Sequence, residues 1–193
     1  MLSDTDRELA LDLAVRAIDE GLRTGRRWHP EHGVLTPALR EVRASFVTLH
    51  RDGALRGCIG SLVATDPLGF DVARRAQDAA FSDPRFAPVA AAEVDHLHVE
   101  VSVLSVPEPV LVTGWAELRE IVRPGVDGLV VQAGYQRGTF LPAVWKQLPD
   151  PEGFLDALWR KAGMVPRSWP RGLEISRYST EEFGRQARAN ARR

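Results

Sequence analysis

The 193-residue sequence predicts an α+β fold that contains two copies of one structural unit. In both halves a predicted hairpin is followed by a helical region and then by another strand. The segment Asp66-Pro67-Leu68-Gly69-Phe70 also recurs in similar form as Asp150-Pro151-Glu152-Gly153-Phe154. Each copy is too small to bury its own apolar face well. We therefore expect the copies, about 44–106 and 127–180, to share one curved, barrel-like sheet.

A regular apolar stripe over residues 11–22 predicts a helix before the first copy, and Gly25 is a natural stop. The stretch 28–37 has the composition of a loop. It contains His29 and His32, but no cysteine or carboxylate stands at a familiar metal-ligand spacing. The sequence therefore predicts no metal site.

The first copy opens with a predicted β-hairpin. Residues 44–50 are rich in β-branched and aromatic side chains, which favour a strand. Asp52-Gly53 predicts a type I′ turn, because glycine readily accepts the positive φ that this turn requires. The returning strand over 55–61 contains Cys58, the only cysteine of the chain.

The rest of the first copy is predicted to be a helix and a strand. Asp66 is the expected N-cap of the helix, and Pro67 stands in its first turn. The helix is expected to end before Pro84, because proline disfavours helix in the residue before it. Residues 97–104 alternate between apolar and polar types, which indicates a strand.

The second copy repeats this order with less regular signals. Residues 114–123 form an irregular or weakly helical link, and 185–193 form a basic tail. The remaining expected elements are a strand over 127–132, a return through 139–141, a helix that starts at Asp150-Pro151 and a last strand over 173–178.

The run from Arg56 to Ser61 is the candidate functional site. Alternate side chains of a strand share a face, so Arg56 and Cys58 are expected on the same side, where the cation would favour a thiolate. Gly57 and Gly60 leave bare backbone that a ligand or another backbone can approach. Ile59 and Ser61 complete the candidate binding segment. The opposing interpretation, that Cys58 is a small buried hydrophobic residue, stays open.

The strand over 97–104 supplies a second group of candidates. His98, Glu100 and Ser102 share one face, which is either a solvent-facing surface or the polar wall of a cleft. Glu100 is a candidate catalytic base for Cys58, and His50 and His98 are alternatives. His98 and Ser102 are also candidate binding residues.

Composition narrows the class of protein. The net charge is −1, so no overall basic field favours nucleic acid or an anionic membrane. No apolar run approaches membrane-spanning length. A single cysteine excludes an internal disulfide and fits a reducing compartment, and the first residues lack a signal-peptide pattern. We expect a cytoplasmic protein.

Several segments, in this order, resemble the AMMECR family, whose bacterial and archaeal members are often called AmmeMemoRadiSam system protein A. The similarity spans most of residues 4–184, a single domain, and its most specific part is the Arg-Gly-Cys-Ile-Gly-Ser run. The resembling segments are Phe46-Val47-Thr48-Leu49, Leu55-Arg56-Gly57-Cys58-Ile59-Gly60-Ser61, Phe81-Ser82-Asp83-Pro84-Arg85-Phe86, Val99-Glu100-Val101-Ser102-Val103-Leu104 and Phe140-Leu141-Pro142-Ala143-Val144-Trp145.

The resemblance implies a two-lobed fold with duplicated β-β-β-α-α-β units and a signature run near a cleft. It implies association with a Memo-like protein and a radical S-adenosylmethionine protein, but it supplies no established reaction and no cofactor.

Three classes of function follow from the candidate site. In an enzyme, Cys58 would be a nucleophile or redox thiol. In a binding or adaptor module, the glycine-lined strand would hold a small molecule or peptide through its backbone. Nucleic-acid binding ranks last: Gly57-x-x-Gly60 is similar to the GxxG loop of KH domains, but the net charge is near zero.

Overall fold

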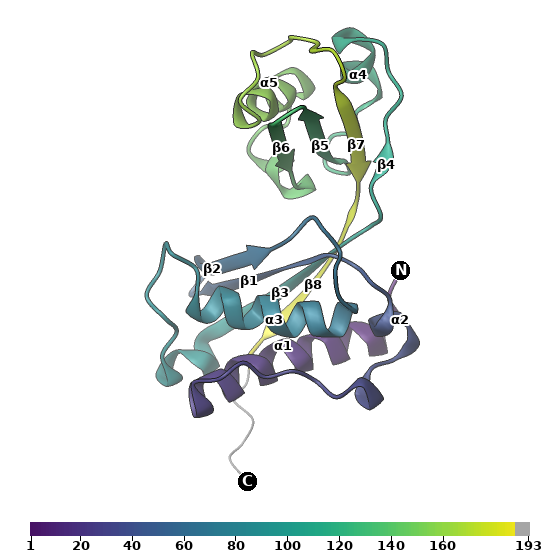
Figure 1. Cartoon of the computed structure of the whole chain (residues 1–193). Coiled ribbons are helices and arrows are strands. Elements are labelled where there is room, and N and C mark those ends of the chain that lie inside the picture. Colours follow the sequence, from purple (N-terminus) through teal and green to yellow (C-terminus); the bar gives the residue numbers. More distant parts are fainter. Residues whose placement is uncertain (188–193) are drawn as a thin grey trace. The chain divides into compact units, whose positions relative to one another are not determined.

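The computed structural model describes residues 1–187 and divides into two compact units (Figure 1). Unit 1 is Met1–Leu104 together with the segment that begins at Glu181, and unit 2 is Ser105–Thr180. The chain thus leaves unit 1 after Leu104 and returns to it at Glu181. Both units combine helices with antiparallel strands, so the predicted α+β class is confirmed.

Unit 1 contains a four-stranded sheet, in which the strands lie in the order β2-β1-β3-β8. Strand β1 pairs antiparallel with both β2 and β3. The two long helices, α1 and α3, lie side by side on one face of this sheet (Figure 1). The elements are α1 (Asp4–Thr24), η1 (His32–Val34), α2 (Pro37–Arg40), β1 (Ser45–Arg51), β2 (Ala54–Gly60), α3 (Leu68–Phe81), η2 (Ala91–His96), β3 (Leu97–Leu104) and β8 (Thr180–Gln186).

Local signals explain most element boundaries in unit 1. Helix α1 ends at Gly25, which has a φ of 67°, as the sequence predicts. The predicted N-cap of α3 is wrong: Pro67 holds the N-cap position. The Asp66 carboxylate instead lies 2.8 Å from the Arg74 guanidinium, so it is engaged with a side chain of the helix rather than with its first N–H groups.

The β1–β2 hairpin has the predicted turn and one unpredicted bulge. Asp52 and Gly53 have φ angles of 52° and 80°, as a type I′ turn requires. Gly57 lies opposite Leu49 and Leu55 lies opposite His50, so Arg56 is an extra residue in β2. A bulge of this kind redirects the side chain of the inserted residue.

The inner face of the sheet, which faces α1 and α3, forms the core of unit 1. Every second residue of β3 is fully buried there, namely Leu97, Val99, Val101 and Val103. Helix α3 approaches β2 closely, because a Cβ atom added at Gly57 would lie 2.1 Å from the backbone oxygen of Ala79. The absence of a side chain at Gly57 is therefore required by the packing of α3 on the sheet.

Unit 2 is a second four-stranded sheet, with the order β4-β7-β5-β6. Its core is aromatic: Trp145 and Phe154 stack with ring centroids 3.7 Å apart. The predicted weakly helical link over 114–123 contains a true helix, α4. The elements are β4 (Glu108–Pro109), α4 (Trp115–Ile121), β5 (Gly128–Ala133), β6 (Gln136–Phe140), η3 (Pro142–Lys146), α5 (Pro151–Lys161) and β7 (Glu174–Tyr178).

The expectation of one shared, barrel-like sheet differs from the structure, which has two separate sheets. Each unit has its own hydrophobic cluster, so neither sheet depends on the other to bury its apolar face. The repeated Asp-Pro-x-Gly-Phe segments also differ in detail. Phe154 is fully buried, whereas Phe70 is only partly buried beside His32.

The predicted basic tail is partly wrong. Residues up to Gln186 belong to β8, and the Arg185 guanidinium pairs with Glu8 at 2.7 Å and with Asp12. Ala187, the next residue of the predicted tail, is buried, and its backbone N–H donates to the Leu97 carbonyl oxygen. Residues 188–193 lie outside the described residues. In the part of the chain that the structure describes, no helix is both long enough and apolar enough to cross a lipid bilayer.

Substitution of Gly57 by alanine should lower the free energy of unfolding by about 1–3 kcal/mol, because the new methyl group would meet backbone rather than a movable side chain. Urea unfolding measures this change. Gly33→Ala is the matched control, since a Cβ there has nothing within 4 Å. Equal stability of the two variants would contradict the close packing of α3 on β2.

Candidate functional site

The candidate site lies on the outer face of the unit 1 sheet, defined here as the face opposite α1 and α3. The strand register aligns Cys58 of β2, Thr48 of β1 and Glu100 of β3 in one row across this face. A second row aligns Gly60, Phe46 and Ser102.

A third position pairs His50 with His98. His98, Glu100 and Ser102 therefore do share a face, and it is the face that carries Cys58. Glu100 and Cys58 are separated by the whole width of β1. Two strand spacings amount to about 10 Å, so Glu100 is too distant to remove a proton from the thiol directly.

Cys58 is partly buried and held from three directions. The Thr48 hydroxyl donates a hydrogen bond to Sγ at 3.3 Å. The backbone N–H of Cys58 donates to Oδ2 of Asp83 at 2.9 Å, and its carbonyl oxygen accepts from Nη2 of Arg85 at 3.1 Å. Both backbone contacts come from the loop that follows α3.

Asp83 is the anchor of that loop. Its side chain is almost completely buried and accepts hydrogen bonds from the Arg85 backbone N–H at 3.1 Å, Nε at 2.9 Å and Nη2 at 2.6 Å. The hydrogen bonds from the Arg85 side chain hold the pKa of Asp83 well below its usual range. A buried carboxylate remains ionised here because the guanidinium and the two backbone donors compensate its lost hydration.

The Arg85 side chain remains 54% exposed although it is bonded to Asp83. The hydrogen bond to Asp83 raises the pKa of Arg85, and the neighbouring Cys58 side chain raises it further. The guanidinium also lies 5.5 Å from the centre of the Phe86 ring. Arg85 is thus a fixed, partly exposed cation beside the thiol.

Arg56 does not have the predicted position beside the thiol. Its Nε and Nη2 donate to the two carboxylate oxygens of Glu93 at 2.9 Å and 3.0 Å, and Nη1 donates to the Ala87 carbonyl oxygen at 2.9 Å. The bulge in β2 accounts for this direction. Arg56 therefore fastens the segment before β3 to β2, and Arg85 provides the cation near Cys58.

The Glu93 carboxylate accepts hydrogen bonds from two further donors besides Arg56. The Ala90 backbone N–H donates to it at 2.8 Å and the Arg51 guanidinium at 2.9 Å. These hydrogen bonds, above all those from the Arg56 side chain, lower the pKa of Glu93 to about 2.

The other residues of the predicted binding segment have mainly structural positions. Gly57 and Ile59 face the core of unit 1, so only their backbone can reach a ligand on the outer face. A Cβ at Gly60 would lie 2.2 Å from the Phe46 ring, so this glycine makes room for an internal contact. The Ser61 hydroxyl forms a local turn with the backbone of Val63.

Sequence reasoning did not identify Thr48, Asp83 and Arg85 as parts of the site. A local sequence signal for Asp83 and Arg85 does exist. The Asp83 side chain accepts a hydrogen bond from the backbone N–H of Arg85, two residues later, and this arrangement is an Asx turn. The contact of this turn with β2 is long-range and has no sequence signature. Among residues 1–187, no group of three or more His, Cys, Asp or Glu side chains is arranged to hold a metal ion.

The fold and the Cys58 segment agree with a family assignment. The AMMECR1 family model matches residues 11–183, and the chain belongs to this family. The expectation drawn from the resemblance is confirmed at this level.

Known relatives cover nearly the whole chain. A protein from Methanothermobacter thermautotrophicus is 41% identical over 86% of each chain. Protein PF1979 from Pyrococcus furiosus is 39% identical over 94% of this chain and 89% of its own. The crystal structure of the uncharacterized protein PH0010 from Pyrococcus horikoshii is similar at a TM-score of 0.86 and 36% identity, covering 96% of this chain and 94% of its own.

Removal of the Glu93 charge should destabilise the protein in a pH-dependent way. The lowered pKa of Glu93 means that its ionised form contributes stability fully above the ordinary glutamate pKa, about 4.3, and that this contribution is lost as the pH falls towards 2. We expect Glu93→Gln to cost about 1–3 kcal/mol at pH 7, because Arg56 loses its ionic partner.

The difference in free energy of unfolding between Glu93→Gln and the unmodified protein should become smaller as the pH is lowered from 4.5 to 2. Chemical unfolding at several pH values measures it. Glu31→Gln is the control, because Glu31 is exposed and its side chain does not cap η1. A Glu93 effect that is independent of pH would contradict the ion-pair assignment.

Proposed function

We propose that Cys58 is the reactive thiol of a substrate-binding site on the outer face of unit 1 and that it supports thiol-based catalysis. One observation carries this proposal: the Thr48 hydroxyl donates to the Cys58 thiol, and a partly exposed guanidinium, Arg85, which a buried carboxylate holds in place, donates to the carbonyl oxygen of the same cysteine. A cation beside a cysteine favours the thiolate, which is the nucleophilic form.

The arrangement suits attack on a carbonyl-type electrophile. A bond forms between Sγ and the carbonyl carbon, and the π electron pair of the carbonyl moves onto its oxygen. Arg85 would stabilise that negative charge, because its guanidinium is fixed in advance by Asp83. The thiol proton passes to water, since among the described residues no histidine or carboxylate hydrogen-bonds to Sγ.

A second candidate function is a non-catalytic binding or adaptor module that uses the same segment for a small molecule or peptide. Internal contacts alone explain why the motif contains Gly57, Gly60 and Arg56, so these residues need no catalytic role, and this favours the binding module. In that case the loop around Asp83 would fix the shape of the surface, and Cys58 would be a packing residue.

We make two further proposals, about partners and about compartment. The protein would act with a Memo-like protein and a radical S-adenosylmethionine protein, as the resemblance to AmmeMemoRadiSam system protein A implies. It would act in the cytoplasm, since a single cysteine cannot form an internal disulfide and fits a reducing compartment.

We also propose that the two units descend from one duplicated unit. The strand order β2-β1-β3 of unit 1 corresponds to β6-β5-β7 of unit 2. In each unit a hairpin is followed by a helix, α3 or α5, and then by the third strand. The different surroundings of Phe70 and Phe154 limit the correspondence to topology.

The rate of Cys58 alkylation by iodoacetamide in the folded protein tests the proposed function. We expect Arg85→Ala to slow the reaction at pH 7 by about threefold to tenfold, because the neighbouring positive charge is lost. Arg85→Lys should retain part of the rate. Arg40→Ala is the matched control, since Arg40 is exposed and lies outside this site.

Two outcomes would overturn the thiol proposal. If Cys58 reacts only when the protein unfolds, the thiol is structural and the binding-module function is favoured. If Arg85→Ala and Arg40→Ala react at the same rate, Arg85 does not activate the thiol. Cys58→Ser supplies the background rate, and its thermal unfolding shows whether Cys58 also contributes to packing.

A further inference from the structure

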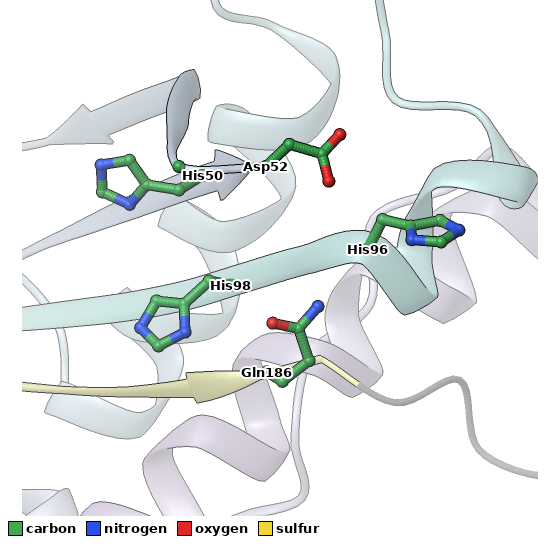
Figure 2. Close-up of a pocket in the computed structure, with 6 residues that line it drawn as sticks. His50, Asp52, His96, His98 and Gln186 are labelled. Atoms are coloured by element: carbon green, nitrogen blue, oxygen red, sulfur yellow. The ribbon is translucent and has the colours of Figure 1, made fainter.

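A hollow of about 330 Å³ lies at the hairpin end of the unit 1 sheet, away from the Cys58 row (Figure 2). It is distinct from the contacts described above, because none of its residues bonds to Cys58, Asp83 or Arg85. The lining residues are His50, Asp52, Gly53, His96, His98 and Gln186.

Two of its three histidines form a cross-strand pair. His50 of β1 and His98 of β3 lie directly opposite each other in the antiparallel register. Side chains at such positions have Cβ atoms about 4.5–5.5 Å apart and project to the same face. Figure 2 shows the two rings turned towards the same side, whereas the His96 ring points away from them.

The position of the His98 ring is restricted by the neighbouring strand. A Cβ atom added at Gly184 of β8 would lie 2.8 Å from Nε2 of His98 and 2.8 Å from the Val99 carbonyl oxygen. The glycine thus leaves the space that the imidazole occupies. A ring seated in this way has fewer orientations to lose on binding a ligand, which favours affinity.

Gln186 adds an oriented polar group to the same hollow. Its amide nitrogen donates to the Asp95 carbonyl oxygen at 3.0 Å. This bond directs the amide oxygen away from Asp95, and Figure 2 shows it on the side of His98. The lining contains no lysine or arginine, so no lining cation opposes a metal ion. Asp52 adds little negative charge, because its carboxylate lies 3.5 Å from the Arg51 guanidinium.

We propose that His50 and His98 together bind one exchangeable divalent transition-metal ion such as Zn²⁺, Ni²⁺ or Cu²⁺. Neutral imidazole is a preferred ligand of these ions, and two imidazoles on one face of a sheet can reach the same ion. Water would occupy the remaining coordination positions.

The proposed site differs from a structural metal site. Within the described residues no third His, Cys, Asp or Glu side chain completes a cluster with this pair. Two protein ligands bind more weakly than the four of a structural zinc site and leave positions open to an external ligand. The proposal departs from the sequence prediction of no metal site, because the cross-strand pairing of His50 with His98 is visible only in the structure.

Isothermal titration of the full, untagged chain with zinc chloride at pH 7.5 tests the proposal. We expect one equivalent of zinc to bind. His50→Ala and His98→Ala should each weaken binding at least tenfold, whereas His96→Ala, which lines the same hollow, should change it less than twofold. His98→Asn replaces His98→Ala if thermal unfolding shows that the alanine variant is destabilised. Cys58→Ser should bind zinc normally, which separates this site from the thiol.

Acidification provides an independent readout, because protonated imidazole does not bind metal. Zinc affinity should fall as the pH is lowered, because protons compete with the metal for the imidazole nitrogens. The other titratable side chains near the pair are Asp52 and His96 in the hollow, with Glu100 and Glu182 further along β3 and β8. The absence of zinc binding, or binding that survives both His50→Ala and His98→Ala, would overturn the proposal.

Discussion

The buried carboxylate of Asp83 is the interaction on which the candidate site depends. It accepts hydrogen bonds from the Cys58 backbone and from the backbone and guanidinium of Arg85, so it joins the end of α3 to the edge strand β2. A buried, ionised carboxylate is stable only while these donors remain in place. The geometry around the thiol is therefore coupled to the packing of α3 against the sheet, which in turn requires a glycine at position 57.

The two faces of the unit 1 sheet have different roles: the inner face forms the core, and the outer face carries the candidate site. The inner face buries alternate residues of β1 and β3 beneath α1 and α3, and it also takes up Gly57 and Ile59 from the motif. The outer face carries Cys58 and the polar residues of β1 and β3. A strand alternates its side chains, so one short motif can serve both packing and chemistry. This explains why only part of the Arg56-Gly57-Cys58-Ile59-Gly60-Ser61 run reaches the outer face.

Structural features that depend on neighbouring residues, such as turns and strand faces, could be predicted from the sequence. Contacts between residues far apart in the chain could not. The hairpin turn at Asp52-Gly53 and the polar face of β3 follow from local backbone preferences. The last two residues of β8, Arg185 and Gln186, were predicted to be part of a basic tail, because they lack apolar side chains and the pairing of β8 with β3 is a long-range contact. Arg56 was predicted beside Cys58 from ideal strand alternation, but the bulge and the distant Glu93 redirect it. The role of Arg85 depends on a loop 27 residues from Cys58, which no local pattern specifies.

The central claim is that Asp83 acts on the thiol through Arg85. A double-mutant cycle that combines Asp83→Asn and Arg85→Ala, with the alkylation rate of Cys58 in the folded protein as readout, tests this claim most directly. If Asp83 acts mainly through Arg85, Asp83→Asn slows alkylation when Arg85 is present and has a much smaller effect once Arg85 is alanine; that remainder reflects the hydrogen bond from the Cys58 backbone to Asp83. Losses that multiply in the double variant would show that the two residues act independently, and they would contradict the proposed coupling.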